Sequence, residues 1–432
     1  MGDAYVRRRG VCLSTLGCKV NRVESDSIAE ELAAVGIELV SENEALVVVI
    51  NTCTVTGEAD RKARKMIRRA LRDPGAPPVV VTGCMAAIDP DALTALGSRV
   101  IVVADKARVV TRIVEILAGM SSATVGSPRS GDVSHPGNPV SVARRTRALL
   151  KIEDGCDAFC AYCIVPYTRG APRSIPLDEV VSSAHELVAH GAPEIVLTGI
   201  NIGRYRDGES DLCEVVAAVA GTGVGRLRLS SIEPLDITPR LLSVLADTAA
   251  FCRHLHVPLQ SGSDRVLASM GRAYDTEAYR RRIEMARAAL PGLAVTADVI
   301  CGFPTEQSED AEATAAFVRD LELTGLHVFR YSARSGTKAA VMDGQVHPGE
   351  IARRADRLRR VGDELKGHFL SSLVGSSRSV LMESKRADGR WEGSTPDYAR
   401  VVVEGCAEIE SGHVARVLLT DMGNGVLLGR EE

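Results

Sequence analysis

The sequence predicts an α/β protein in three parts: an N-terminal doubly wound α/β domain, a central partial (β/α)6 barrel, and a small C-terminal β-barrel. Short apolar runs alternate with segments of helical periodicity over most of the chain, which is typical of parallel sheets covered by helices. Residues 371–432 instead hold short strand-like runs separated by turn residues, which is typical of a small barrel.

The length and composition fit several globular domains. At 432 residues the chain is too long for one ordinary core, and its 45% hydrophobic and 25% charged residues fit a globular protein. No apolar run approaches the ~18 residues of a membrane span, and the basic N-terminus lacks the apolar stretch of a signal peptide. We therefore expect a cytoplasmic protein with no membrane partner. The eleven cysteines then indicate metal ligands or core thiols, not a disulfide framework.

Residues 1–120 are predicted to form the doubly wound domain. Strands are expected at residues 11–15, 45–51, 78–82 and 100–103, and helices at residues 25–35, 58–72 and 109–117. Ile28, Leu32 and Val35 share one face of the first helix. The strand at 45–51 is apolar almost throughout, as a strand buried on both faces is.

Three cysteines follow three of these strands. Cys18, Cys53 and Cys84 each come just past a strand end, next to Gly, Thr or Asn. Ligands of doubly wound sheets bind beyond the carboxyl ends of the strands, where neighbouring strand ends lie close together. We therefore expect the three thiols to converge on one site, although they are far apart in the sequence. The alternative is that each is a buried core thiol.

The helix expected at residues 58–72 is strongly basic. It carries Arg61, Lys62, Arg64, Lys65, Arg68, Arg69 and Arg72. Apolar residues recur between them at helical spacing, so the charges occupy the exposed side of the helix. This side is either simply solvated or suited to a phosphate backbone, and the sequence does not separate the two. Because the net charge of the whole chain is −4, nucleic-acid binding would have to come from such a local patch.

Residues 121–143, rich in Ser, Gly and Pro, predict a linker, and residues 144–370 predict the barrel domain. Strands are expected at 147–152, 194–199, 226–231, 254–259, 294–300 and 326–331, and helices at 177–190, 212–220, 239–247, 276–290, 308–323 and 350–369. Six consecutive βα units predict an open barrel, whose site lies at the carboxyl ends of its strands.

A compact set of thiols follows the first strand of this barrel. Cys156, Cys160 and Cys163 stand at C-x3-C-x2-C spacing, so one loop can wrap all three around one metal centre. A four-iron cluster needs four ligands, and three thiolates leave one iron open to a small molecule. This pattern predicts radical chemistry with S-adenosylmethionine (SAM). A zinc site would need a fourth ligand, and the nearest histidines, His185 and His190, look like residues of a helix surface.

Glycines and polar residues follow the other strands of the barrel. Gly199 and Gly302 suit a close approach of the backbone to a ligand. Ser231, Glu233 and Gln260 could hold a ribose or an amino acid group. Each residue alone is more often part of a turn, but their repetition at strand ends favours a ligand site.

Residues 371–432 are predicted to form the small β-barrel. Strands are expected at 377–383, 399–403, 413–420 and 425–428. This segment holds seven Lys and Arg against ten Asp and Glu. Such an acidic module is not an obvious RNA-binding surface.

Together these motifs resemble the radical-SAM methylthiotransferases over nearly the whole chain. The matching blocks are Thr-Leu-Gly-Cys-Lys-Val-Asn at 15–21, Asn-Thr-Cys-Thr-Val-Thr at 51–56, Thr-Gly-Cys at 82–84, the cysteine loop at 155–170, Leu-Gln-Ser-Gly-Ser-Asp at 259–264, and Tyr-Ser-Ala-Arg-Ser-Gly-Thr at 331–337. The resemblance implies a TRAM-like C-terminal barrel, SAM and two [4Fe–4S] clusters. It assigns Cys156, Cys160 and Cys163 to the SAM-binding cluster, with Tyr162 near the adenine, and Cys18, Cys53 and Cys84 to the cluster that carries the sulfur.

The first block distinguishes branches of that family. Leu-Gly-Cys-Lys-Val-Asn is similar to the MtaB type, which inserts a methylthio group at C2 of N6-threonylcarbamoyladenosine at position 37 of tRNA. The branches that act on isopentenyl-adenosine 37 or on a ribosomal-protein aspartate usually have Gly-Cys-Gln-Met-Asn or Gly-Cys-Pro-Lys-Asn there. The resemblance thus implies the tRNA anticodon loop, a low-potential electron donor and a sulfur donor as partners. An electron-transfer protein with iron–sulfur clusters, or a zinc-binding module, is the alternative from another functional class.

Overall fold

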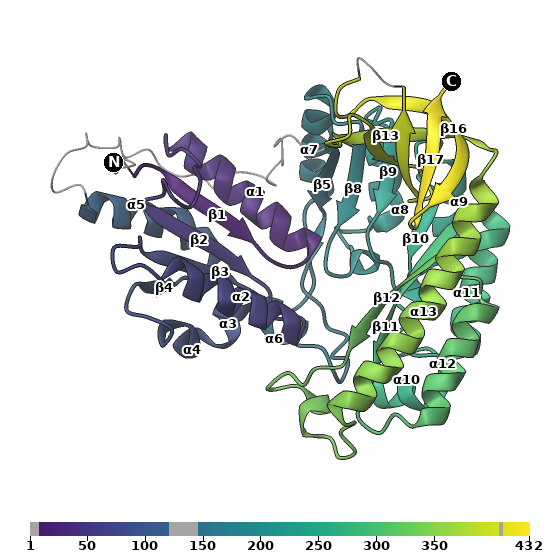
Figure 1. The fold of residues 1–432 in the computed structure, drawn as a ribbon, viewed down its shortest axis with the longest axis horizontal. Coiled ribbons are helices and arrows are strands. Elements are labelled where there is room, and N and C mark those ends of the chain that lie inside the picture. Colours follow the sequence, from purple (N-terminus) through teal and green to yellow (C-terminus); the bar gives the residue numbers. More distant parts are fainter. Residues whose placement is uncertain (1–7, 121–145, 406–408) are drawn as a thin grey trace. The chain divides into compact units, whose positions relative to one another are not determined.

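A computed structural model describes residues 8–120, 146–405 and 409–432 (Figure 1). The described residues form two compact units. The first consists of residues 8–120 and Ile164–Ala171, and the second of residues 146–163 and Pro172–Glu432. The linker expected at 121–143 lies outside the described residues.

The first unit is built on a parallel sheet. Its strands β1 (Val11–Thr15), β2 (Val47–Thr52), β3 (Val79–Gly83) and β4 (Val100–Val102) pair in that order. A parallel bridge between Val11 and Leu39 adds a short extended segment on the other side of β1. The chain therefore leaves β1 in one direction and builds β2 to β4 in the other. This reversal between β1 and β2 confirms the doubly wound sheet.

Helices cover both faces of this sheet. One face carries α1 (Lys19–Ala34) and α5 (Val109–Met120), and the other carries α2 (Gly57–Ala70), α3 (Cys84–Ile88) and α4 (Pro90–Thr94). Successive residues of a strand point to opposite faces, so the apolar run of β2 serves both cores. Val49 packs with Leu32 on the first face, and Ile50 packs with Ile67 on the second.

The second unit contains six parallel strands in chain order. They are β5 (Arg147–Lys151), β8 (Glu194–Thr198), β9 (Arg226–Leu229), β10 (His254–His256), β11 (Ala294–Cys301) and β12 (Gly325–Arg330). Bridges from Leu227 to Phe251 and from Ser231 to His256 join β9 to β10. No pairing joins β12 back to β5 in the described part of the chain, as expected for an open barrel.

Helices follow these strands on the outside of the barrel (Figure 1). They are α7 (Leu177–Ala189), α8 (Leu212–Ala220), α9 (Pro239–Asp247), α11 (Thr276–Ala289) and α12 (Ser308–Asp320), with the long α13 (Pro348–Leu373) packed along β12. Two elements were not predicted, α10 (Asp264–Met270) and the hairpin of β6 (Glu153–Asp154) with β7 (Arg173–Ser174). Both are too short to show a periodicity.

The C-terminal strands close a barrel in the order β13-β14-β15-β17-β16. They are β13 (Ser377–Lys385), β14 (Trp391–Ser394), β15 (Arg400–Glu404), β16 (Val414–Gly423) and β17 (Val426–Glu431). The sequence predicted this barrel but not β14. That strand has a single large apolar residue, Trp391, which lies in the barrel core, so it shows no alternation.

This C-terminal barrel is anchored at the amino-terminal ends of β8 and β9. Glu194 is fully buried and pairs with Arg226 Nε at 3.0 Å and with Arg228 Nε at 2.8 Å. The Arg228 guanidinium also donates to the Pro396 carbonyl and lies 4.4 Å from the centroid of the Tyr398 ring. The barrel therefore sits away from the carboxyl ends of the strands, where the site of a (β/α) barrel lies.

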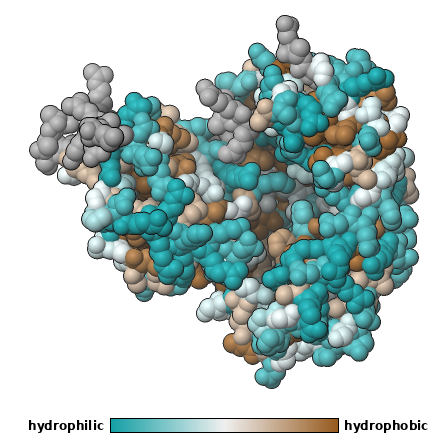
Figure 2. All heavy atoms as spheres, viewed as in Figure 1, coloured by the Kyte–Doolittle hydropathy of each residue, from teal (hydrophilic) through white to brown (hydrophobic). Residues whose placement is uncertain are grey.

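The surface of the described chain is mainly hydrophilic, as expected when the apolar residues are buried in these cores. Figure 2 shows hydrophilic residues over most of the visible face, with apolar residues in small groups. Among the described helices, none has the length and apolar character that crossing a membrane requires.

Candidate functional site

Cys18, Cys53 and Cys84 all lie at the carboxyl-terminal edge of the first sheet. Cys18 stands between β1 and α1, Cys53 directly follows β2, and Cys84 directly follows β3. Burial is the main cause that raises the pKa of the Cys53 thiol to about 11, and the neighbouring Cys18 and Cys84 raise it too. Such an effect of one thiol on another requires them to be close. The fold thus brings together three thiols that the sequence separates widely.

Two glycines make this approach possible. Gly17 has φ +112°, and a Cβ built there would lie 2.6 Å from Cys53 Cβ and 3.0 Å from Cys53 Sγ. Gly83 has φ +92°, and a Cβ there would collide with the carbonyl oxygen of Thr52. Both residues need a backbone conformation that L side chains rarely adopt, and neither has room for a side chain.

Two buried asparagines hold the strand ends in place. Asn21 Nδ2 donates to the carbonyls of Leu16 and Thr52, both at 2.9 Å, and Asn51 Nδ2 donates to the carbonyl of Asn21 at 3.0 Å. Oδ1 of Asn51 and the hydroxyl of Thr82 are buried and have no hydrogen-bond partner among the described residues. This edge therefore offers unsatisfied polar atoms beside the thiols, as a ligand site does.

The short helix α6 (Val165–Arg169) of the first unit supplies a buried positive charge at this edge. Arg169 Nη1 lies 2.8 Å from Glu24 Oε1, and its Nη2 lies 2.7 Å from Asn21 Oδ1. That amide oxygen is in turn 3.6 Å from Cys18 Sγ. Burial raises the pKa of the Cys18 thiol, and the charge of Arg169 acts against this rise. The guanidinium therefore favours a thiolate at Cys18. Arg169 lies within the sequence block at 155–170, but nothing in that block indicated this role.

The second set of thiols stands in the loop after β5 and β6. Gly155 has φ +93° and Phe159 has φ +46°, so the backbone turns sharply on both sides of Cys156. Burial raises the pKa of the Cys156 thiol, and the adjacent Cys160 contributes to the rise. Cys163 follows Cys160 in a turn closed by a 2.9 Å backbone hydrogen bond between the two. The three cysteines thus lie in one sharply turned loop, and their role as ligands of one metal centre stays a prediction.

The rest of the second unit fixes this loop in place. Ala161 N–H donates to the Met270 carbonyl, and its own carbonyl accepts from Ala339 N–H, both at 2.8 Å. Tyr162 packs on the small core that these residues form with Phe303. Burial raises the pKa of Tyr162 well above its usual value, so the phenol stays neutral.

Arg272 links the loop to two other strand ends. Its Nη1 lies 3.1 Å from Cys160 Sγ, its Nη2 contacts the carboxylate of Glu233, and its Nε donates to the Tyr274 hydroxyl at 3.1 Å. The Tyr274 hydroxyl lies 3.1 Å from the Leu259 carbonyl, to which it donates. The positively charged guanidinium of Arg272 thus lies directly beside the sulfur of Cys160. This role could not be predicted from the sequence, because Arg272 follows the unpredicted helix α10.

A buried carboxyl group lies at the base of the same loop. Glu153 Oε2 accepts from the backbone N–H of Ile200 at 3.0 Å and of Asn201 at 2.8 Å. Burial raises the pKa of Glu153 to about 7. Its Oε1, with Asn201 Oδ1 and Ser230 Oγ, is buried and has no partner in the part of the chain that the structure describes. A Cβ at Gly199 would lie 2.9 Å from Glu153 Oε2, so this glycine makes room for the carboxyl group.

The other residues predicted for the cofactor differ in their placement. Gln260 is buried at φ +67°, with its backbone bridged to Val299. Ser231 is exposed just past β9. A Cβ at Gly302 would collide with Ile351, so that glycine makes room for α13. The packing of α13 is therefore one reason for a glycine at this position, and a contact of Gly302 with a ligand stays a prediction.

Strands β10 to β12 carry one further polar cluster that the sequence analysis missed. His256 Nε2 and His327 Nδ1 lie 3.0 and 3.1 Å from Asp298 Oδ1, and the two imidazole rings stack with centroids 5.1 Å apart. Burial acts against ionisation of Asp298, but the hydrogen bonds from both histidines hold the pKa of its carboxyl well below the usual range. These residues satisfy one another, so the cluster is already complete without a ligand.

Family comparisons divide the chain as the fold does. Residues 10–104 match the family described as "Uncharacterized protein family UPF0004", and residues 150–318 match the "Radical SAM superfamily". The chain is 37% identical to the "Threonylcarbamoyladenosine tRNA methylthiotransferase MtaB" of Bacillus subtilis, over 96% of this chain and 94% of the relative. It is 33% identical to the Thermotoga maritima protein of the same name, over 86% of each. It is also 31% identical to the "tRNA-2-methylthio-N(6)-dimethylallyladenosine synthase" of Thermodesulfovibrio yellowstonii, over 95% and 96%.

Solved structures show the same fold at low sequence identity. The radical S-adenosylmethionine methyltransferase TsrM from Kitasatospora setae superposes with a TM-score of 0.55 at 16% identity, over 77% of this chain and 74% of that one. The cobalamin-dependent S-adenosylmethionine radical enzyme OxsB gives a TM-score of 0.52 at 10% identity, over 84% and 56%. At these identities the likeness shows the fold alone.

Proposed function

Because the chain belongs to the radical-SAM tRNA methylthiotransferase family, we propose that it inserts a methylthio group at C2 of N6-threonylcarbamoyladenosine at position 37 of tRNA. The observation that carries this proposal is the presence of two separate sets of three thiols, each gathered at the carboxyl ends of parallel strands. The relatives of Bacillus subtilis and Thermotoga maritima support the substrate, since their names state it. A tRNA substrate implies that the enzyme acts in the cytoplasm.

Each set of thiols fits an iron–sulfur cluster that keeps one iron free of protein ligands. The ligands would be Cys156, Cys160 and Cys163 in the loop, and Cys18, Cys53 and Cys84 at the edge of the first sheet. The Cys53 thiol, with its pKa raised to about 11 by burial, does not ionise at neutral pH by itself, and a bound cation removes that cost. Two [4Fe–4S] clusters and SAM, when bound, supply a 5′-deoxyadenosyl radical and a sulfur atom that is methylated and transferred.

The residues around the loop would hold SAM and keep its surroundings dry. Glu153, Asn201 and Ser230 present unpartnered polar atoms suited to the amino and hydroxyl groups of SAM. Arg272 donates a direct hydrogen bond of 3.1 Å to Cys160 Sγ and so helps to hold that side chain in place. The sequence-based contacts at Tyr162, Gly199, Ser231, Glu233, Gln260 and Gly302 remain predictions for the same ligand.

The chain's part in the reaction is to orient and protect reactants. A base at position 37 lies in a single-stranded loop and can be splayed out of its stack into a protein pocket. Adenine C2 carries no leaving group and its C–H bond is not acidic, so a radical is needed there. Turnover also needs a low-potential electron donor and a sulfur donor, both separate from this chain.

A second candidate substrate is isopentenyl-adenosine at position 37. The relative from Thermodesulfovibrio yellowstonii, named for the dimethylallyl substrate, is 31% identical to this chain. The MtaB-named relatives are 37% and 33% identical, and the Gly-Cys-Lys-Val-Asn block at residues 17–21 also favours threonylcarbamoyladenosine.

Mass spectrometry of tRNA nucleosides tests the proposal. In a strain that lacks the gene, 2-methylthio-N6-threonylcarbamoyladenosine should disappear and its unmodified precursor should accumulate. The wild-type gene should restore the product, and a Cys156→Ala gene should not. An unchanged level of the product in the deletion strain would refute the proposal, and loss of the isopentenyl product instead would establish the second candidate.

A further inference from the structure

Helix α2 carries a stripe of cations that no described residue neutralises. Three of its basic side chains are paired: Lys62 with Glu58 at 2.7 Å, Arg64 with Asp89 at 3.3 Å, and Arg69 with Glu42 at 3.3 Å. The others, here called the cation stripe, are Arg61, Lys65 and Arg68 on the helix and Arg72 just after it. All four are exposed, and none makes an ion pair with the described residues.

The cation stripe faces directly away from the protein core. Its residues recur at spacings of four, three and four, so they share one side of the helix. The opposite side is formed by the buried Ala63, Ile67 and Ala70. The paired cations lie on the flanks between the two sides. Neighbouring members of the stripe are about 5–6 Å apart at their Cβ atoms, which gives a regular row of positive charge.

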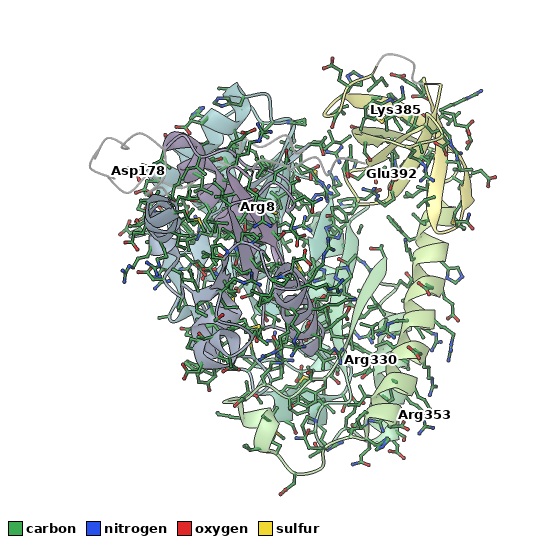
Figure 3. All side chains as sticks on the ribbon, turned by 60° about the vertical axis from the view of Figure 1, so that its left-hand side comes forward. Arg8, Asp178, Arg330, Arg353, Lys385 and Glu392 are labelled. Atoms are coloured by element: carbon green, nitrogen blue, oxygen red, sulfur yellow. The ribbon has the colours of Figure 1, made fainter. Side chains whose placement is uncertain are left out.

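Other basic segments of the described chain are largely neutralised by carboxylates. On α13, the side chains of Arg353, Arg354, Arg357 and Arg359 each pair with an acidic residue, whereas Arg360 and Lys366 make no ion pair with the described residues. On the C-terminal barrel, five of the seven basic residues are paired, namely Arg378, Arg386, Arg390, Arg400 and Arg416. Glu392, labelled on that barrel in Figure 3, contacts both Arg386 and Arg400. A phosphate group approaching these arginines must compete with the carboxylates already beside them.

We propose that the cation stripe binds the phosphate backbone of the substrate RNA, and that it contributes more to RNA binding than the acidic C-terminal barrel does. This inference rests on the proposed function, because it assumes a tRNA substrate. α2 begins at Gly57, four residues after Cys53, at the same edge of the sheet as the dispersed thiols. RNA bound along the cation stripe would therefore lie on α2, the helix that starts at the sheet edge where Cys18, Cys53 and Cys84 lie. Figure 2 shows hydrophilic surface over the region of the first unit where α2 lies.

Salt dependence of binding measures such phosphate contacts directly. Each cation that neutralises a phosphate releases counterions, so the slope of log K against log salt changes by about 0.7–0.9 per contact. Replacing three members of the stripe, in Arg61→Gln, Lys65→Gln and Arg68→Gln combined, should lower that slope by about 2–3. The measurement uses the full-length holoenzyme and a tRNA transcript that carries N6-threonylcarbamoyladenosine at position 37.

The same helix provides a matched control. The triple variant Lys62→Gln, Arg64→Gln and Arg69→Gln also removes two arginines and one lysine, but these three are already paired. Its slope should change by less than about 1. A second control, Lys385→Gln with Arg430→Gln, removes the two cations of the C-terminal barrel that make no ion pair with the described residues, and it should have a smaller effect than the stripe variant. Iron content and the midpoint of thermal unfolding show that each variant is folded.

The outcomes separate this inference from the proposed function. If the wild-type holoenzyme binds the tRNA and methylthiolates it, but the stripe variant keeps the wild-type salt slope, the inference is wrong. Equal losses in the stripe variant and its matched control would also overturn it, because net charge alone would then explain binding. If the wild-type enzyme neither binds nor modifies the tRNA, the proposed function itself fails. A rescue variant with Arg61→Lys and Arg68→Lys should keep the wild-type slope.

Discussion

Replacing Gly17 by Ala should remove the metal centre at Cys18, Cys53 and Cys84 and leave the loop centre in place. The Cβ of the new residue would lie 2.6 Å from Cys53 Cβ, whereas ordinary van der Waals contact begins at 3.4 Å. One of the two residues must therefore move by about 0.8 Å. Ligand distances in a metal site tolerate only about 0.2 Å, so this movement exceeds what a cluster ligand can absorb.

Gly36→Ala is the matched control for this change. Gly36 has φ +77°, but a Cβ there meets no atom within 4 Å. Both variants bear the cost of a side chain at positive φ, about 1–3 kcal/mol each. Only Gly17→Ala adds the contact with Cys53, which costs about 1–3 kcal/mol more by overpacking. The difference between the two variants isolates the close approach at Cys53.

Iron analysis after anaerobic reconstitution, together with product assays, shows whether Gly17→Ala has lost the metal centre at Cys18, Cys53 and Cys84. Gly17→Ala should lose about half of the iron and sulfide, since one of two four-iron clusters is missing, and should form no methylthiolated nucleoside. It should still cleave SAM to 5′-deoxyadenosine. Gly36→Ala should keep the iron of both clusters and the full reaction. A Gly17→Ala protein with wild-type iron content and normal methylthiolation would refute the assignment of Cys53 as a ligand.

Three further changes test other parts of the site. Cys53→Ala should leave formation of 5′-deoxyadenosine intact and abolish methylthiolation by nucleoside mass spectrometry, whereas a variant that fails to fold would indicate a core thiol. Arg272→Gln should cost about 1.5–3 kcal/mol in denaturant unfolding, because it removes a charged hydrogen-bond donor from Glu233 and Cys160, and Arg272→Lys should recover part of this loss. Burial raises the pKa of Glu153 from 4.5 to about 7 in the folded state, so folding favours the neutral carboxyl. The contribution of this carboxyl to the free energy of unfolding is therefore complete below pH 4.5 and is lost as the pH rises through 7. Glu153→Gln should therefore gain about 3 kcal/mol relative to wild type between pH 4.5 and 7.5, measured by unfolding across that range, and equal pH profiles would contradict the buried carboxyl.

The regular elements could be predicted from the sequence wherever a segment was long enough to show its period. α8 and α9 have the predicted bounds, and the strands of the first sheet agree within two residues. The missed elements were short: β14, the β6–β7 hairpin and the helices α3, α4, α6 and α10 have too few residues for a pattern. The extended segment at Leu39 was also missed, because a single β-bridge is too short to produce a recognisable sequence pattern. It nevertheless decides where the sheet reverses.

The placement of the thiols after strands could be predicted from the sequence, but the residues around them could not. Cysteine spacing and position after a strand are visible in the sequence. Arg169, Arg272 and Glu153 act through contacts with residues far away in the chain, such as the 2.8 Å pair between Arg169 and Glu24. A single arginine or glutamate between other charged residues has no pattern of its own. The burial that raises the pKa of Glu153 is likewise a property of the folded chain alone.

The two sets of thiols depend on the fold in different ways. Cys156, Cys160 and Cys163 are neighbours in one loop, so bringing them together costs little loop-closure entropy. Cys18, Cys53 and Cys84 meet only when β1, β2 and β3 are paired and when Gly17 and Gly83 let the strand ends approach. The grouping of the loop thiols is therefore encoded locally, whereas that of the dispersed thiols is encoded by the topology of a sheet that reverses between β1 and β2. Small changes of volume at Gly17 or Gly83 are therefore expected to disturb the dispersed thiols and leave the loop thiols in place.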